Sequence, residues 1–401
     1  MLKPFDLNLR HLRALGEIVA QRSLNCAADR AGLSQPALTQ GLGKLERQLG
    51  VLLFERHSDG VTPTAAGSAL AERAGRAFAQ LARASRRPGR GALRGFSSPE
   101  RLMTATQLEA FLHFADAQSF VGAAAASGLS QPAIHRAVRE LEQICAMPLA
   151  ERRGRGMALT AAGRAMARGV RLLAGEIAAG IEEARGDPED GGRIAIGAMP
   201  LSRALVLPRA LAHFVRNAPG TVIDVVEGSW RELVDPLLDG VIDIMIGALR
   251  DEPPAGVEQV PLFTDRLAIF GRKDHPLAGR KATLADLREQ SWVVGPAGTP
   301  LRTHWEALFK GDAPPVPIEC GSVMVIRGLL VQSDLLTLLS PDQIAVEIES
   351  SMLTRIGPDL PSQMRTIGLS TRADWRPTRA QQRLIDLIKQ ASIETRLQEN
   401  Q

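Results

Sequence analysis

The chain has 401 residues, 45% of them apolar and 23% charged, a composition typical of folded domains and unlike that of disordered or collagen-like chains. No apolar run approaches the ~20 residues that a membrane-spanning helix needs, the first ten residues lack the apolar segment of a signal peptide, and three widely spaced cysteines exclude a disulfide framework. We therefore expect several domains, a cytoplasmic location and no membrane partner.

The net charge of +4 is unevenly distributed along the chain. Residues 1–185 carry 25 Lys and Arg against 16 Asp and Glu, a net charge of +9, whereas residues 186–401 carry 23 against 28, a net charge of −5. A basic segment of this kind is typical of proteins that bind nucleic acid. The charge therefore predicts a nucleic-acid-binding front half and a back half with another role.

The most informative feature of the front half is an internal repeat. Residues 12–67 (copy one) align with residues 108–163 (copy two) at a constant offset of 96, without a gap, and 21 of the 56 positions are identical. The strongest block is Gly-Leu-Ser-Gln-Pro-Ala, at residues 32–37 and again at 128–133. Self-similarity of this length indicates that a domain was duplicated.

Each copy is predicted to contain three short helices, a β-hairpin and the start of a long helix. Apolar residues recur at helical spacing in the first and third helices, and a Gly-containing turn between the second and third makes a helix-turn-helix. The residues expected to cap these helices are Ser23, Gly32, Ser34 and Thr64 in copy one and Ser119, Gly128, Ser130 and Thr160 in copy two. Short strands around Ser58-Asp-Gly60 are expected to form a β-wing.

Three segments of copy one carry a family resemblance: Leu-Ser-Gln-Pro-Ala-Leu-Thr-Gln at 33–40, Leu-Gly-Val-Leu-Leu-Phe-Glu-Arg at 49–56 and Thr-Pro-Thr-Ala-Ala-Gly at 62–67. They resemble the winged helix-turn-helix of LysR-type transcriptional regulators, and copy two shows the same pattern. The resemblance implies that the third helix of each copy enters the major groove of double-stranded DNA. Polar side chains near its N-terminus would then reach base edges, and a wing arginine would bind phosphate.

The DNA-binding positions implied in copy one are Ser34, Gln35, Pro36, Ala37, Thr39, Gln40, Lys44 and Arg56. In copy two they are Ser130, Gln131, Pro132, Ala133, His135, Arg136, Arg139 and Arg152. The alternative is a helical repeat whose periodic residues serve only packing. The polar helix start, the wing and the basic charge favour DNA binding.

The two copies differ inside the third helix. Copy one contains Gly41 and Gly43, each of which costs about 1 kcal/mol relative to alanine in a helix interior. Copy two keeps Arg136 and Arg139 on an uninterrupted helix, but alanine replaces the wing phenylalanine of copy one. We expect copy two to be the main DNA reader. Copy one is then a second DNA contact, a domain kept for packing, or a protein-binding domain.

The segments that follow each copy are expected to differ in structure. The first winged domain (1–72) is followed by an arginine-rich tether at 73–102, because Arg73–Pro99 holds seven arginines and no acid and contains Pro88-Gly-Arg-Gly91. The second winged domain (103–163) leads into a linker helix at 160–186. The apolar stripe of this helix predicts a partner helix, and in the resemblance that helix belongs to a second subunit, which implies a homodimer or homotetramer.

From residue 193 onward, short apolar strands alternate with amphipathic helices, the pattern of an α/β domain. Strands are expected at 194–197, 222–226, 242–247, 267–270, 292–294, 318–320, 336–339 and 365–370, and helices at 201–217, 230–239 and 381–393. This order resembles the effector domain of the same regulators, a two-lobed α/β fold similar to periplasmic binding proteins. Lobe I would contain 192–268 and 365–393, and lobe II 269–364. Segments 246–250, 298–302 and 367–378 resemble the branch that includes galactose-binding-protein regulators.

The resemblance implies a small effector, a sugar or an organic acid, in the cleft between the lobes. Helix N-termini there would offer N–H groups and a partial positive charge, which suit carboxylates and hydroxyl-rich ligands. The matching positions are Met199, Ser202, Arg203, Ala248, Thr299, Arg302, Ser322 and Val323. A structural role is the alternative for each, since Ser202 and Thr299 are suitable N-caps. His275 is expected to be a turn residue and not an acid–base catalyst.

These patterns together predict a sequence-specific DNA-binding transcriptional regulator, not an enzyme, controlled by an effector that closes the two lobes. The expected partners are double-stranded DNA, the effector, further copies of the chain and RNA polymerase. The alternative is an α/β enzyme or a solute-binding protein with accessory helical domains. The sequence contains no nucleophile elbow, P-loop or GxGxxG motif and no paired metal ligands among its seven histidines, so we expect no cofactor and no metal.

Overall fold

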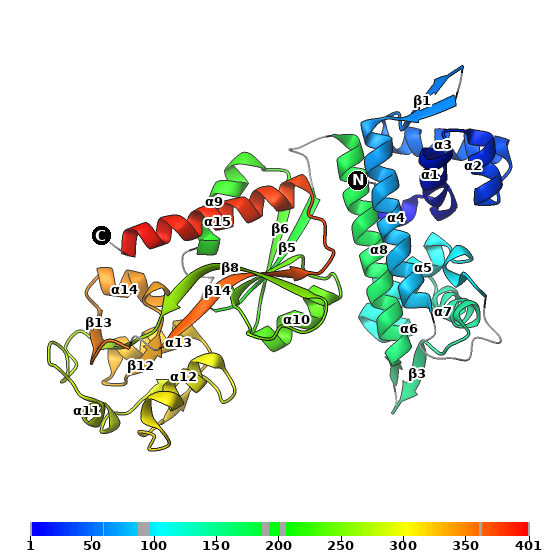
Figure 1. The fold of residues 1–401 in the computed structure, drawn as a ribbon. Coiled ribbons are helices and arrows are strands. Elements are labelled where there is room, and N and C mark those ends of the chain that lie inside the picture. Colours follow the sequence, from blue (N-terminus) through cyan, green and yellow to red (C-terminus); the bar gives the residue numbers. More distant parts are fainter. Residues whose placement is uncertain are drawn as a thin grey trace. The chain divides into compact units, whose positions relative to one another are not determined.

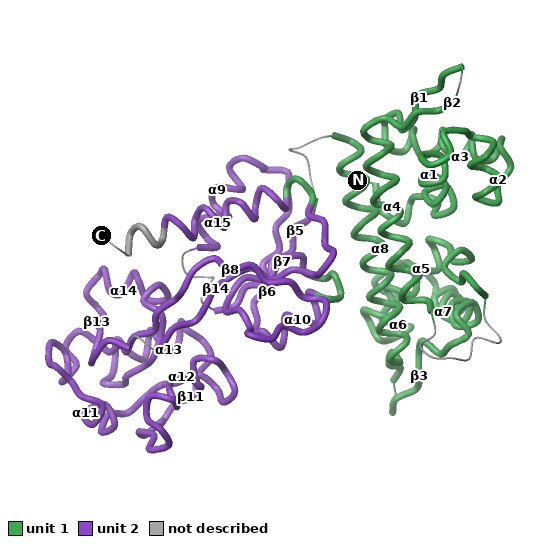
Figure 2. The backbone as a smooth tube through the Cα atoms, viewed as in Figure 1, with its two compact units in different colours: residues 1–192, 238–241, 378–380 green, residues 193–237, 242–377, 381–401 purple. Residues whose placement is uncertain are grey.

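The computed structural model describes residues 2–58, 60–86, 96–154, 156–186, 192–200, 206–360 and 363–399. The chain divides into two compact units, which Figure 2 shows in different colours. Unit 1 contains residues 1–192, 238–241 and 378–380, and unit 2 contains residues 193–237, 242–377 and 381–401. None of the helices in the described part of the chain combines the length and the apolar character that a membrane span requires.

Unit 1 contains the same order of elements twice (Figure 1). The first set is η1 (Pro4–Asp6), α1 (Leu9–Gln21), α2 (Leu24–Ala31), α3 (Gln35–Leu49), β1 (Phe54–His57), β2 (Gly60–Pro63) and α4 (Ala65–Ser85). The second set is η2 (Pro99–Arg101), α5 (Ala105–Ala117), α6 (Phe120–Ser127), α7 (Gln131–Cys145), β3 (Ala150–Arg153), β4 (Gly156–Leu159) and α8 (Ala161–Arg185). We call α1–α3 with β1–β2 head one, and α5–α7 with β3–β4 head two.

The residues predicted to cap the helices do so in both heads. Ser34 Oγ and Ser130 Oγ each accept a hydrogen bond from the backbone N–H three residues later, at 3.4 and 3.3 Å. Gly32 (φ 65°) and Gly128 (φ 72°) adopt the left-handed conformation that ends α2 and α6. Glycine adopts this conformation without strain. The turn before each third helix therefore has the same physical basis.

Helix α4 corrects the prediction of a tether at residues 73–102. The helix continues to Ser85, so the first part of the predicted tether is regular structure, while residues 87–95 lie outside the described residues. Arg73, assigned to the solvated tether, is only 1% exposed. The prediction failed because it weighed the arginine content and overlooked the helical spacing of the buried apolar positions Leu70, Ala74, Ala77, Phe78 and Leu81.

Helices α4 and α8 pack against each other in antiparallel orientation (Figure 1). A Cβ atom built on Gly169 of α8 would lie 2.3 Å from the Cβ atom of Ala84, near the end of α4. A Cβ atom built on Gly180 would lie 3.0 Å from the Cβ atom of Arg73, in the first half of α4. Glycine at these two positions therefore allows the two helices to approach closely.

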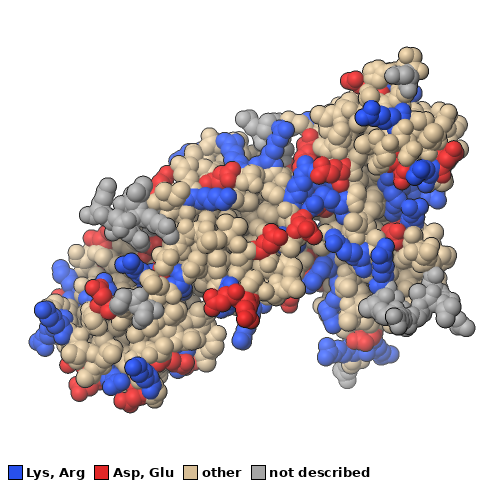
Figure 3. Space-filling model, in the orientation of Figure 1, with Lys and Arg blue, Asp and Glu red and all other residues tan. Residues whose placement is uncertain are grey.

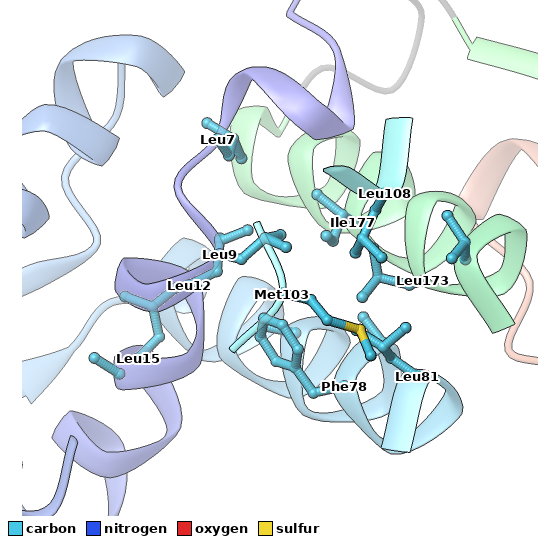
Figure 4. Close-up of a cluster of buried hydrophobic side chains, with 14 of the residues drawn as sticks. Leu7, Leu9, Leu12, Leu15, Phe78, Leu81, Met103, Leu108, Leu173 and Ile177 are labelled. Carbon is cyan, nitrogen blue, oxygen red and sulfur yellow. The ribbon is translucent and has the colours of Figure 1, made fainter. Parts of the chain in front are cut away.

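The sequence predicted that the apolar stripe of α8 packs against a partner helix, which the family resemblance places in a second subunit. In the structure, Leu173 and Ile177 of this stripe instead lie in one cluster with Phe78 and Leu81 of α4 (Figure 4). The partner helix is thus supplied by the same chain. The sequence pattern did not identify α4 as this partner, because periodicity shows only that a helix face is buried and not which helix covers it.

Ionic contacts join the same two helices. Arg73 Nη1 lies 2.9 Å from Glu176 Oε2, and Arg73 Nη2 lies 2.5 Å from Glu183 Oε1. Arg76 Nε lies 3.1 Å from the other carboxylate oxygen of Glu176. Burial alone would lower the pKa of Arg73, but its hydrogen bonds to Glu183 and Glu176 raise that pKa above its ordinary value. The buried guanidinium is therefore charged and paired.

The back half is built on two main β-sheets, with strand orders β6-β5-β7-β14-β8 and β12-β9-β13. Its elements are β5 (Gly192–Ala198), α9 (Val206–Asn217), β6 (Thr221–Glu227), α10 (Trp230–Leu238), β7 (Ile244–Ala248), β8 (Val257–Arg266), β9 (Ala268–Arg272), α11 (Leu284–Arg288), β10 (Val293–Val294), α12 (Pro300–Phe309), β11 (Ile318–Glu319), α13 (Val323–Gln332), β12 (Thr337–Leu339), η3 (Pro341–Ile344), α14 (Ala345–Glu349), β13 (Leu353–Ile356), β14 (Met364–Arg372) and α15 (Arg379–Glu399). Strand β5 pairs in parallel with β7, whereas β14 is antiparallel to both β7 and β8.

The chain passes between the two sheets twice. Strand β8 of the first sheet continues directly into β9 of the second, and β13 of the second sheet leads back to β14 of the first. Both β8 and β13 were missed in the sequence, and the helix predicted at 201–217 is described only from Val206 onward. The second sheet has a core of its own, in which the rings of Trp292, Trp305 and Phe309 meet edge to face at 5.4–5.9 Å between centroids.

Replacing Arg73 by methionine is expected to lower the free energy of unfolding by about 3 kcal/mol, because Glu176 and Glu183 would lose a partner in a buried site. Urea unfolding followed by circular dichroism measures the change. The matched control is Arg83→Met on the same helix, where the side chain is exposed and a change within about 0.5 kcal/mol is expected. Equal losses at the two positions would show that the ion-pair cluster does not stabilise the helix pair.

Candidate DNA-binding surface and effector cleft

The start of α3 presents most of its predicted DNA-binding side chains to solvent. The exposed ones are Ser34, Gln35, Pro36, Gln40 and Lys44. Ala37 and Thr39 are half-buried, and Thr39 Oγ1 is enclosed without a hydrogen-bond partner among the described residues. Gln35 and Gln40 are therefore better placed than Thr39 to reach a base.

Every predicted position on α7 and at its N-cap is exposed: Ser130, Gln131, Pro132, Ala133, His135, Arg136 and Arg139. The ring of His135 lies 5.1 Å from the ring of Phe120 on α6, which supports one side of the imidazole. Arg139 Nη1 lies 3.3 Å from Glu142 Oε2 but remains 67% exposed, and surface pairs of this kind contribute little stability. Helix α7 therefore offers more cationic groups near its start than α3 does.

A glutamate on each third helix holds the wing that follows it. Glu46 Oε1 accepts hydrogen bonds from two successive backbone N–H groups at the start of β1, at 2.9 and 3.4 Å. Glu142 Oε1 accepts the equivalent pair at the start of β3, at 2.8 and 3.1 Å. Both copies contain a Leu-Glu pair at the same position of the repeat, at residues 45–46 and 141–142, and the role of its glutamate is therefore structural. The glutamate fixes the strands on which Arg56 and Arg152 are exposed.

The repeated Thr-Ala-Ala-Gly motif also has a structural role. Thr64 Oγ1 and Thr160 Oγ1 each accept a hydrogen bond from the N–H three residues later, at 3.0 and 2.9 Å, and so begin α4 and α8. A Cβ atom built on Gly67 or Gly163 would lie 1.9 Å from a backbone carbonyl oxygen of the segment before the wing. Only glycine fits where the long helix passes this backbone.

Gly41 shows why the third helix of head one contains glycine. A Cβ atom at Gly41 would lie 2.5 Å from His11 Cδ2, so the imidazole of α1 packs directly on the backbone of α3. The corresponding residues in head two are Gln107 and Ala137, and Gln107 Nε2 donates to a carboxylate of α7 at 2.6 Å. At Gly43 the nearest atom to such a Cβ would be 3.5 Å away. Packing against His11 thus accounts for Gly41 and leaves Gly43 unexplained.

The basic residues of unit 1 are not confined to one patch. Figure 3 shows Lys and Arg atoms at several places on the visible face of unit 1, with Asp and Glu atoms between them. One group lies near the β3–β4 hairpin, to which the exposed residues Arg152 and Arg153 belong. Phosphate contacts from such a wing would add affinity without sequence preference.

Unit 2 contains a cavity of about 320 Å³ at the ends of β5 and β7 and at the N-termini of α12 and α13. This volume is in the usual range for small-ligand sites. Four predicted ligand positions line it: Met199, Ala248, Thr299 and Val323. The described lining contains Arg231, Arg250 and Arg365 but no Asp or Glu, which favours an anionic ligand.

Two predicted ligand residues are held in other interactions and are not among those that line the cavity. Arg302 Nε lies 2.7 Å from Glu306 Oε1, and Arg302 Nη1 lies 2.8 Å from Glu319 Oε1, so this arginine belongs to a surface ion-pair network. Ser322 Oγ caps α13. The structural alternative stated for Arg302 is therefore the better description, and for Ser322 the cap explains the residue. Ser202 and Arg203 lie outside the described residues.

Two buried donors in the cavity were missed in the sequence. Gln343 is 4% exposed; its Oε1 accepts from Ser340 N at 3.3 Å, and its Nε2 has no hydrogen-bond partner among the described residues. Arg365 Nε donates to Asp265 Oδ2 at 2.7 Å, and in the described part of the chain Arg365 Nη2 also lacks an acceptor. Buried donors without acceptors are costly. They are therefore suited to a ligand that supplies oxygen atoms.

The N-terminus of α12 adds further donors. Thr299 occupies the N-cap position, but its Oγ1 donates to Pro296 O at 2.8 Å and makes no capping hydrogen bond to the helix. The first turn of the helix begins at residues that line the cavity. Uncapped N–H groups at a helix N-terminus carry partial positive charge and bind anions.

His275 has the turn position expected from the sequence. Its side chain is 3% exposed, with Nδ1 accepting from Leu277 N at 3.1 Å and Nε2 lying 3.1 Å from Asp334 O. Burial lowers the pKa of His275. A neutral imidazole that accepts at Nδ1 and donates at Nε2 satisfies both contacts, so the ring closes a turn.

Comparison with known proteins gives matches along nearly the whole chain. A model described as bacterial regulatory helix-turn-helix protein, lysR family, matches residues 9–68 and again residues 105–164. A model described as LysR substrate binding domain matches residues 188–392. The helix-turn-helix matches coincide with the two sets of elements in unit 1.

Individual relatives agree with these models. The chain is 31% identical over 396 residues to HTH-type transcriptional regulator GalR of Pseudomonas putida, covering 96% of this chain and 98% of that protein. It is 33% identical over 278 residues to the SDS degradation transcriptional activation protein of a Pseudomonas species, covering 67% of this chain and 89% of that protein. The fold is similar to a full-length OxyR variant from Pseudomonas aeruginosa, with TM-score 0.56, 22% identity, and coverage of 72% of this chain and 94% of that chain.

Gly41→Ala is expected to lower the free energy of unfolding by about 1–3 kcal/mol, because the new methyl group would overlap the His11 ring. Gly43→Ala is the matched control and is expected to stabilise the protein by up to about 1 kcal/mol through helix propensity. Chemical denaturation measures both. His11→Ala in the Gly41→Ala background is expected to recover most of the loss, and an unchanged loss there would exclude the His11 contact as its cause.

Proposed function

The chain belongs to the LysR family of bacterial transcriptional regulators, and we propose that heads one and two are duplicated winged helix-turn-helix domains that read double-stranded DNA through α3 and α7. The observation that carries this proposal is the exposed start of α7, which presents Gln131, His135 and Arg136 to solvent. Amide and guanidinium groups at the start of a helix in the major groove form paired hydrogen bonds with adenine and guanine edges. Head two is then the stronger reader.

Head one is a second reader in this proposal. Gln35 and Gln40 are exposed at the start of α3, and Arg56 is exposed on the wing. The contact between Gly41 and His11 makes α3 a packed helix despite its glycines. This support favours DNA contact over a role in packing alone.

The effector in this proposal is a small organic anion, bound in the cavity of unit 2. Arg365 Nη2 and Gln343 Nε2 would donate to its oxygen atoms, and the N–H groups at the start of α12 would add positive potential. A sugar is the less favoured choice because the described lining holds three arginines and no acid that could accept from hydroxyl groups. The closer assignment to galactose-binding-protein regulators stays a prediction.

Regulation in this proposal depends on the two sheets of unit 2. The cavity takes Ala248 from β7 of one sheet and Leu338 from β12 of the other. A ligand that contacts both lobes favours the arrangement in which both contacts are made. The two crossings between the sheets are the segments about which such lobes would turn. A cytoplasmic location, association of several chains and contact with RNA polymerase belong to the same proposal.

Gln131→Ala and Arg136→Ala are each expected to weaken specific DNA binding by about 1–3 kcal/mol, roughly 5- to 150-fold. The measurement is fluorescence anisotropy with duplexes that the wild-type chain selects from a random-sequence library. Gln143→Ala, an exposed glutamine at the other end of α7, is the matched control and should leave binding unchanged. Equal affinities for all three variants would remove α7 from the DNA interface.

Gln343→Glu is expected to weaken binding of carboxylates more than tenfold. The substitution keeps the oxygen that accepts from Ser340 N and replaces the donor in the cavity by a second acceptor. Isothermal titration of succinate, benzoate and galactose against the purified chain gives the affinities, with Gln332→Glu on the exposed side of α13 as the control. If galactose bound and the acids did not, the anionic effector would be ruled out.

A further inference from the structure

We propose that a single chain carries both readers of one operator, and that the operator consists of two unlike half-sites. The inference rests on the proposed DNA-binding function. Helices α4 and α8 pair within the chain as two identical helices pair across a two-fold axis, and they join heads one and two in one compact unit. The DNA that fits this reader is a duplex with two different sequences, one for each head.

The contacts between α4 and α8 have the symmetry of a dimer interface. The repeat offset of 96 relates Arg73 to Gly169 and Ala84 to Gly180. The approach of Gly169 to Ala84 and the approach of Gly180 to Arg73 are therefore the same contact, once from each end of the helix pair. In a two-fold interface, residue i contacts residue j and residue j contacts residue i. The pair α4–α8 meets this condition within one chain.

The buried faces of the two helices follow the same offset. The buried residues Leu70, Ala71, Ala74, Ala77, Leu81 and Ser85 of α4 correspond to Met166, Ala167, Val170, Leu173, Ile177 and Ile181 of α8, all of them buried. The interface between α4 and α8 is thus formed by equivalent residues of the two copies of the repeat.

The short helices η1 and η2 each pack against the long helix of the other set of elements. Segment η1, which belongs to the first set of elements, packs against α8 of the second set, and η2 of the second set packs against α4 of the first. Figure 4 shows Leu7 and Leu12 from the first set in one cluster with their counterparts Met103 and Leu108. The buried residues of unit 1 therefore form one continuous cluster to which both heads contribute.

Charge and size favour this unlike pair over a pair of identical helices. Arg73 is buried because Gly180 lies opposite it and because Glu176 and Glu183 bind its guanidinium. In a pair of two α4 helices, the counterparts of these two glutamates would be Gln80 and Arg87. In a pair of two α8 helices, the counterpart of Arg73 would be glycine. A buried charge without its partner is strongly destabilising, so α4 pairs with α8 in preference to a second α4.

The two heads present different chemistry to DNA. Figure 1 shows head one and head two at opposite ends of the α4–α8 pair, with α3 and α7 on the same side of it. Positions 39 and 40 of α3 are Thr and Gln, whereas the corresponding positions of α7 are His and Arg. Cationic and amide side chains prefer different base edges. The half-sites read by the two heads must therefore differ in sequence.

The first test uses the full-length chain and a duplex that it selects from a random library. Hydroxyl-radical footprints are compared for Gln35→Ala/Gln40→Ala in head one and Gln131→Ala/Arg136→Ala in head two. We expect each variant to lose protection at its own half-site, with affinity reduced about tenfold or more. Loss at both half-sites from the head-two variant, with no effect of the head-one variant, would overturn the inference and leave DNA binding by α7 intact. No effect of either variant would instead contradict the proposed function.

The second test asks whether α4 and α8 of one pair come from one chain. Arg76 and Glu176, which form an ion pair across the two helices, are replaced by cysteine and joined with a short bismaleimide in a mixture of unlabelled and 15N-labelled chains. We expect cross-linked peptides that are wholly unlabelled or wholly labelled. Mixed peptides would show that the helices are exchanged between two chains and would overturn the inference. The footprints need no change in these helices, so they remain decisive if this variant folds poorly.

Discussion

The charged side chain of Arg73 can be buried because the carboxylates of Glu176 and Glu183 bind it. Both glutamates lie on α8, which runs antiparallel to α4, the helix of Arg73. Its side chain reaches them because Gly180 leaves room opposite its Cβ atom. The ion-pair cluster, the two glycines and the apolar stripe all act on one contact, the packing of α4 against α8. The position of the third helix of each head follows from it, since α1 and α5 pack against these long helices and also pack against α3 and α7.

The local structure of the heads could be predicted because short-range physics determines it. Ser34 and Ser130 begin α3 and α7 because their hydroxyl groups accept a hydrogen bond from the N–H three residues later. Gly32 and Gly128 end α2 and α6 because glycine adopts the positive φ that this position requires. The repeat strengthened these predictions, since each signal occurs twice. Periodicity also identified the buried face of α8. What it could not supply was the partner, because a stripe has the same pattern whether it meets its own chain or another.

The features that could not be predicted from the sequence depend on contacts between residues distant in the chain. Gln343 and Arg365 belong to no motif, and they reach one cavity only because η3 and β14 come together in unit 2. Strand β8 was missed because Pro261 lies inside it and its residues do not alternate between apolar and polar, since Val260 is exposed and Asp265 is buried. In contrast, Met199, Ala248, Thr299 and Val323 could be named in advance because the family resemblance implied them, and all four line the cavity.

The differing residues at the starts of α3 and α7 have an evolutionary consequence. When two identical subunits read a palindrome, each mutation in the reading helix changes the preference for both half-sites at once, and a new operator must acquire matching changes at both. Two readers encoded in tandem, as we propose for this chain, are released from this coupling. One helix can drift to a new sequence while the other keeps the protein on its old promoter, so a regulator of this kind can acquire new target genes through single, separately tolerated steps.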